Sequence, residues 1–172
     1  MKSELDFIFA RRSIRIYQPD HVDEGLVRDL LEAAMAAPSA VAKDPWEFVV
    51  VRHRDVLARM AEGLPNGKML IHAPVGIVVC GDLQRAHDQQ LSYLLQDCSA
   101  AIENLLLAAT RLGLGACWLG VHPRQERVEH IRSLLNIPDR IIPVAAIALG
   151  WPAESQEPRT RYRDHAVHYE TW

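Results

Sequence analysis

The sequence predicts a single domain of the α+β class, spanning residues 1–172. Segments of helical periodicity are interleaved with short β-branched and aromatic runs, but without the strict strand–helix–strand rhythm of a parallel α/β fold. The chain is 49% apolar and carries a formal net charge of -3. This composition is typical of a soluble domain with one buried core, and the slight acidic excess argues against a nucleic-acid-binding protein, which normally carries a basic excess.

Two helices are expected before the first strand. Over residues 3–10 the apolar side chains recur at helical spacing, and arginines follow where cations complement a helix C-terminus. Asp23 is a suitable N-cap for a second helix, whose apolar stripe extends from Leu26 to Met35. Pro38 is expected to end this helix, because proline cannot continue it.

The rest of the chain predicts four buried strands and three further helices. Apolar runs indicate strands over residues 46–51, 74–81, 116–121 and 141–150. Helical periodicity indicates helices over residues 54–63, 88–112 and 124–135. The helix 88–112 would be roughly 36 Å long, and its few charges suggest burial on two sides, one of them against a second subunit.

The cysteines and histidines give no indication of a disulfide framework or a metal site. Cys80, Cys98 and Cys117 are odd in number and lie in apolar contexts, which suit buried thiols. His165 and His168 are three residues apart, but they fall in a polar tail, so no metal is expected there. The chain lacks the roughly 18 to 20 continuous apolar residues of a membrane span and lacks a signal-peptide pattern, so a cytoplasmic protein is expected.

Common catalytic and nucleotide-binding motifs are absent from the sequence. It contains no G-x-S-x-G, H-E-x-x-H, G-x-x-x-x-G-K or C-x-x-C pattern. Gly113-Leu114-Gly115 has the opening of a dinucleotide-binding fingerprint, but Trp118 occupies the sixth position. The segment also follows a helix and leads into a strand, which reverses the context that the fingerprint requires.

Two arginine clusters are the main indication of a binding site. Guanidinium groups match phosphate oxygens in bidentate geometry, so several of them beside a hydroxyl can hold a monophosphate. Solvated surface charge is the alternative interpretation. The first cluster is Arg11, Arg12, Ser13 and Arg15, and the second is Arg159, Arg161 and Arg163, whose alternation directs the side chains to one side of an extended chain.

Taken in order, these and other segments resemble the FMN-dependent nitroreductase family. The similarity spans nearly the whole chain, and it depends on the order and spacing of the segments rather than on any one of them. The matching segments are Arg11 to Arg15, Ala37 to Ala40, Pro45-Trp46 with Phe48 to Val51, the alanine-rich helix leading into Gly113 to Gly120, Ala148 to Gly150, Pro152 to Glu154, and His168 to Trp172.

The resemblance implies a sandwich fold, with a mainly antiparallel central sheet flanked by helices, in an intertwined homodimer. Two FMN molecules would lie at the subunit interface, and residues 151–172 would form an arm on the partner subunit. The tail ends in Tyr169 and Trp172, and such aromatic residues need a surface to pack against.

The resemblance also implies which residues bind FMN. One group would hold the phosphate and ribityl chain, a second would come from the other protomer, and a third would line the flavin ring. These groups are Arg11, Arg12, Ser13 and Arg15 with Arg159 and Arg161; Pro38, Ser39 and Ala40; and Asn66, Lys68, Trp118, Leu119 and Gly120.

The implied activity is an NAD(P)H-dependent oxidoreductase reaction. Hydride would pass to N5 of FMN and then, in a ping-pong cycle, to a nitroaromatic, quinone or similar acceptor, with no amino-acid catalytic residue and no metal. An arginine near N1 of the flavin would stabilise the negative charge that develops. Two alternatives stay open: a specialised flavin-dependent reductive enzyme, for example in dehalogenation or ring reduction, and a non-catalytic FMN-binding dimer.

One loop departs from the family pattern. Where the family commonly reads Gly-Asn-x-Gln, this chain has Val41-Ala42-Lys43-Asp44. The change removes an amide at residue 42 that is expected near the flavin or the substrate, and Lys43 could restore a hydrogen-bond donor. The departure therefore leaves the acceptor open, and the sequence does not decide between NADH and NADPH.

Overall fold

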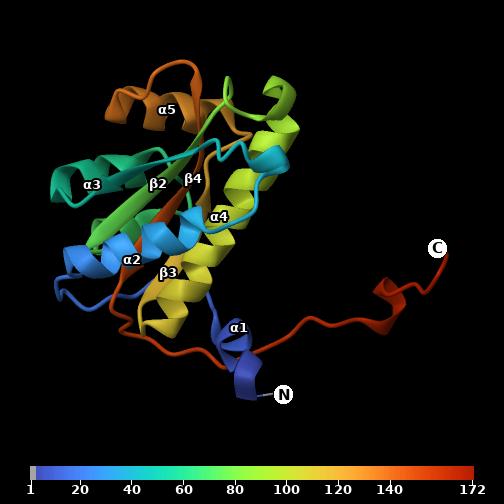
Figure 1. The fold of residues 1–172 in the computed structure, drawn as a ribbon. Coiled ribbons are helices and arrows are strands. Elements are labelled where there is room, and N and C mark those ends of the chain that lie inside the picture. The colour runs from blue at the N-terminus through green and yellow to red at the C-terminus, as the bar shows by residue number, and fades with distance from the viewer. Residues whose placement is uncertain (1–2) are drawn as a thin grey trace.

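An antiparallel sheet of four strands forms the centre of the computed structural model, which describes residues 3–172 (Figure 1). The strand order is β1-β2-β4-β3, and every neighbouring pair is antiparallel. The α+β class and the antiparallel sheet expected from the sequence are therefore confirmed. The strands are β1 (Trp46–Val51), β2 (Val75–Asp82), β3 (Gly115–Gly120) and β4 (Ile141–Gly150).

Helices cover both faces of this sheet. Ile77 and Ile147 project into the core shared with α2 and α4, whereas Val78 and Ala146 project into the core shared with α3 and α5. Because both faces are covered, the two central strands are buried along almost their whole length, and Asp82 at the end of β2 is their one charged residue. The helices are α1 (Asp6–Ala10), α2 (Glu24–Met35), α3 (Arg54–Glu62), α4 (Leu91–Arg111) and α5 (Gln125–Leu135).

Helix boundaries follow the capping residues more closely than the prolines. Asp23 caps α2 as expected, because its carboxylate accepts a hydrogen bond of 2.7 Å from the Gly25 amide. This helix ends at Met35, before Pro38 is reached. Similarly, α5 ends at a left-handed Asn136 (φ 53°). The expectation that α4 begins at residue 88 is wrong, because Asp88 (φ 48°) already leaves the helical region.

The long helix α4 lies between the sheet and α2, and it spans 21 residues, roughly 32 Å. Leu94, Cys98, Ile102 and Leu105 are completely buried within this one chain. All three cysteines are buried and free. In the part of the chain that the structure describes, no helix is long and apolar enough to cross a membrane, and no three metal-ligating side chains gather into a site.

The C-terminal arm leaves the body of the fold after β4 (Figure 1). Its first part runs beside the N-terminal segment, and its last part extends away from both layers of helices. Tyr169 and Trp172 are 81% and 99% exposed, and His168 stacks on Trp172 with ring centroids 4.2 Å apart. Three aromatic side chains at the tip of the arm therefore lack a packing surface in this chain.

Candidate functional site

The segment from Arg11 to Gln18 is held against two neighbouring stretches of backbone. The Ile14 amide donates to the Ala116 carbonyl (3.0 Å) at the edge of β3, and the Gln18 amide donates to the Trp151 carbonyl (2.9 Å). Gly115 makes this approach possible, because a Cβ there would lie 2.7 Å from Cγ2 of Ile14. The arginine segment thus has a fixed path along the edge of the sheet.

Hydrogen bonds join the start of the C-terminal arm to the same segment. The Arg159 amide donates to the Phe9 carbonyl at 3.1 Å, and the side-chain amide of Gln156 donates to the Ser13 carbonyl at 3.0 Å. The Arg12 guanidinium also donates to the backbone carbonyl of Glu157. These contacts bring the two arginine clusters of the sequence together.

The two clusters form one pocket of about 210 Å³, here called the arginine pocket. No carboxylate lines it. Within residues 3–172 only one of its arginines forms an ion pair, Arg11 with Glu103 at 3.4 Å. Arg163 lies outside the pocket, although its spacing predicted that it would join the tail cluster. The lining residues are Arg11, Arg12, Ser13, Arg15, Gln156, Arg159 and Arg161.

The crowded guanidinium groups of this pocket repel one another. The charges of Arg12 and then of Arg161 lower the pKa of Arg159. Cations held this close without acidic partners disfavour the charged state of each other, and a bound anion removes that penalty. The arrangement therefore fits a phosphate group better than it fits a plain solvated surface.

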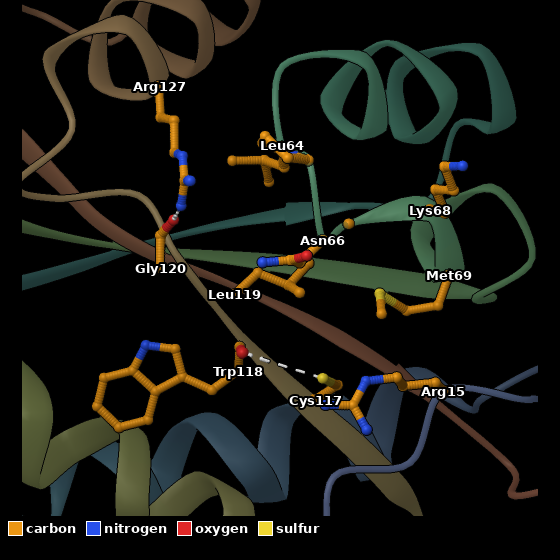
Figure 2. Close-up of a pocket in the computed structure, with 12 residues that line it drawn as sticks. Arg15, Leu64, Asn66, Lys68, Met69, Cys117, Trp118, Leu119, Gly120 and Arg127 are labelled. Carbon is orange, nitrogen blue, oxygen red and sulfur yellow. Dashed lines mark hydrogen bonds between the residues drawn. The ribbon is translucent and has the colours of Figure 1, made fainter.

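A second pocket of about 530 Å³, the central pocket, begins at Arg15 and continues beside the end of β3 (Figure 2). Arg15 and the indole of Trp118 lie at opposite ends of it in Figure 2. The pocket contains all five residues that were expected around a flavin ring. Its lining is Arg15, Leu64, Pro65, Asn66, Gly67, Lys68, Met69, Cys117, Trp118, Leu119, Gly120 and Arg127.

Gly120 leaves open space in this pocket. A Cβ built on Gly120 would have no other atom within 4 Å, so packing within this chain does not require glycine at this position. The guanidinium of Arg127 donates to the Gly120 carbonyl at 2.9 Å, which fixes the backbone at the end of β3 (Figure 2). The buried Nε of Arg127 has no hydrogen-bond partner in residues 3–172. The open space at Gly120 fits a pocket that receives a planar ligand.

Comparison with known proteins identifies the family. The model of the Nitroreductase family matches residues 8–64 and 61–151. The chain belongs to the nitroreductase family. A relative from Methanothermobacter thermautotrophicus, with the provisional name NADH dehydrogenase/NAD(P)H nitroreductase, is 46% identical over 98% of this chain and 87% of its own length. The predicted family and oxidoreductase class are thus confirmed.

Two crystal structures show that nitroreductase-family members share the whole fold. A provisionally named NADH dehydrogenase/NAD(P)H nitroreductase from Parabacteroides distasonis is 40% identical, with a TM-score of 0.93 over 100% of both chains. A provisionally named nitroreductase from Desulfovibrio desulfuricans, solved in complex with FMN, is 32% identical, with a TM-score of 0.84 over 100% of this chain and 99% of its own.

Two buried titratable groups beside the pockets are structural. Burial raises the pKa of the Cys117 thiol, and Arg15 only partly opposes this effect. Burial also raises the pKa of Tyr17, whose hydroxyl lies 2.5 Å from the Ile14 carbonyl and 3.1 Å from the Ala148 carbonyl. Both groups are therefore neutral near pH 7. In this nitroreductase-family chain the Tyr17 hydroxyl ties two backbone carbonyls together.

Pro38, Ser39 and Ala40 line neither pocket. They begin the loop after α2, where the Ala40 amide donates to the buried Asp97 carboxylate at 2.8 Å. Val41 has a left-handed φ of 52°, which a β-branched residue rarely adopts. The contribution of this loop to the site of another protomer stays a prediction.

Sequence reasoning missed several residues that line the two pockets. Arg127 lies on α5, and the sequence pattern of this helix does not distinguish it from an ordinary solvent-exposed arginine. Gln156 and Glu154 belong to the proline-containing tail, yet Gln156 lines the arginine pocket. The Glu154 carboxylate accepts hydrogen bonds from the Arg15 and Ile16 amides, at 2.5 and 3.1 Å. The Pro-Ala-Glu segment that helped to identify the family was the available signal for Glu154.

Proposed function

We propose that this protein is an FMN-dependent oxidoreductase that transfers reducing equivalents from NAD(P)H to a small acceptor such as a nitroaromatic or a quinone. One observation carries the proposal. The two arginine clusters, about 145 residues apart in the sequence, form a single pocket that no carboxylate lines. The FMN complex of the Desulfovibrio desulfuricans relative supports the choice of cofactor.

In this proposal the arginine pocket holds the FMN phosphate. Arg12, Arg159 and Arg161 supply guanidinium donors that have no acidic partner within residues 3–172. Ser13 adds a hydroxyl donor. Arg11 and Arg15 complete the pocket, and because Arg15 also lines the central pocket, it links the phosphate end of the ligand to the ring end.

The central pocket would hold the flavin ring. Leu119 and Gly120 present backbone to it, and the empty space above Gly120 gives room for a flat ring. Asn66 and Lys68 provide polar contacts from the loop after α3, with Trp118 at the far end. The bound FMN supplies the hydride chemistry, so these residues orient it and stabilise charge instead of reacting themselves.

We further propose that the functional unit is an intertwined homodimer. The exposed aromatic tip of the arm supports this, because Tyr169 and Trp172 would bury their rings on a partner subunit. Pro38, Ser39 and Ala40 of the partner subunit would then close the flavin site. Gel filtration with light scattering tests the assembly, and a monomer at micromolar concentration contradicts it.

Anaerobic titration of the FMN-loaded protein tests the proposed function. Addition of NADH or NADPH should bleach the flavin absorbance, and addition of a nitroaromatic or quinone should restore it. Protein that takes up no FMN contradicts the proposal entirely. Protein that binds FMN without bleaching is instead a non-catalytic flavin-binding dimer. Bleaching that only a halogenated or ring-reducible acceptor reverses identifies a specialised reductive enzyme.

A further inference from the structure

A third pocket is here called the outer pocket. Arg15 lines it together with residues that follow Arg15 in the sequence, whereas the arginine pocket includes Arg11, Arg12 and Ser13, which precede Arg15. The outer pocket has a volume of about 510 Å³. Arg15 lines all three pockets, so the outer pocket adjoins the central pocket at this residue. Its lining residues are Arg15, Ile16, Tyr17, Pro19, Arg54, His72 and Pro74.

The polar lining of the outer pocket consists of two guanidinium groups and an imidazole. They belong to Arg15, Arg54 and His72, and no carboxylate lines the pocket. The Arg54 guanidinium donates to the carbonyls of Ala73 (2.7 Å) and Ile71. These bonds use two of its five N–H groups and fix its orientation, so the others are free to bind an anion. Arg54 forms no ion pair within residues 3–172.

The outer pocket also has apolar lining residues. Ile16 is 58% exposed, and Pro19 and Pro74 add two flat, rigid surfaces. A side chain as apolar as Ile16 gains stability when a ring covers it. The pocket therefore suits a ligand that carries both phosphate groups and an aromatic ring.

The size of the central pocket indicates which ligand this is. A volume of about 530 Å³ accommodates one drug-sized molecule. In the proposed function this pocket holds the flavin ring with the nicotinamide ring stacked on it, so the rest of a nicotinamide dinucleotide would extend into an adjoining pocket. The adjoining cationic pocket is the outer pocket.

We propose that the outer pocket binds the adenylate part of NAD(P)H. Arg54 and His72 would contact the adenylate phosphate, and the Ile16, Pro19 and Pro74 surface would pack against the adenine. The inference rests on the proposed function, since it concerns the electron donor of that reaction. According to this inference, residues outside the flavin site make the protein prefer a dinucleotide electron donor to a mononucleotide one.

The test compares two electron donors that deliver the same hydride. Reduced nicotinamide mononucleotide lacks the adenylate part, so in the wild-type protein its kcat/KM should be at least about tenfold below that of NADH. His72→Glu places a carboxylate in the pocket, and Arg54→Met removes a guanidinium. Each should lower kcat/KM for NADH about tenfold and leave the mononucleotide value unchanged. Arg28→Met, which removes an exposed arginine on α2, is the matched control.

Binding of ADP, measured by calorimetry, gives a readout that does not depend on turnover. ADP should bind the FMN-loaded wild type and should bind His72→Glu about tenfold more weakly. Equal efficiency of both donors in the wild type, or an equal loss for both donors in the variants, overturns the inference while the proposed function stands. Absence of flavin bleaching with either donor overturns the proposed function and the inference with it.

Discussion

Substitution of the two arginines at the start of the C-terminal arm, Arg159 and Arg161, should weaken FMN binding and leave the fold intact. Arg159 and Arg161 are exposed, and in residues 3–172 neither side chain has an acidic partner. A hydrogen bond to a charged group contributes about 1.5 to 3 kcal/mol, and exposure favours the lower end. We therefore expect Arg161→Met to raise the Kd of FMN about tenfold, and Arg159→Met/Arg161→Met to raise it by up to about 100-fold.

The same substitutions should weaken FMN binding without destabilising the FMN-free protein. The mutual repulsion that lowers the pKa of Arg159 disappears in the double variant, so the free energy of unfolding of the FMN-free protein should stay level or rise. Fluorescence titration gives Kd and urea denaturation gives stability, with Arg28→Met as the control. Weaker FMN binding together with a clear loss of stability would show that these arginines maintain the fold, which refutes the reasoning.

Three further predictions concern the glycines and the thiols. Gly120→Val should change the free energy of unfolding by less than about 0.5 kcal/mol and yet abolish FMN binding, because its side chain enters the open space of the central pocket; retained flavin absorbance after gel filtration would contradict this. Gly115→Ala should destabilise the fold by about 1 to 3 kcal/mol in urea denaturation, because its Cβ overlaps Ile14, and an unchanged midpoint would contradict it. Burial raises the pKa of Cys80 and Cys98 from 9.0 to about 12. As the pH rises, the thiols of the unfolded chain therefore lose their protons before those of the folded chain. The stability that the two buried thiols contribute below pH 9 should be lost as the pH rises toward 12. A urea denaturation midpoint that does not fall between pH 8 and pH 10 would contradict this prediction.

Most of the secondary structure could be predicted from the sequence, because its signals are local. The β-branched run at β1 and the apolar run at β4 have the expected bounds. Asp23 marks the start of α2 correctly. The start of α4 was misplaced, because Asp88 and Gln89 adopt left-handed backbone that no local pattern announced.

The binding site was predictable only in part, because it depends on contacts between distant segments. The arginine clusters were visible as clusters, and the family resemblance indicated that they act together. By contrast, the role of Gly115 depends on the approach of Ile14, and the position of Arg127 depends on the packing of α5 against α3 and β4. The outer pocket had no sequence signal, since Arg54 and His72 are separated by a helix and a turn.

Comparison of FMN with riboflavin tests the central claim most directly, because the two ligands differ only in the phosphate. Fluorescence titrations of the flavin-free protein with each ligand give the two dissociation constants. If the arginine pocket holds the phosphate, FMN should bind at least about 100-fold more tightly than riboflavin, and this preference should shrink as salt is added. Equal affinity for the two ligands, independent of salt, would contradict the account.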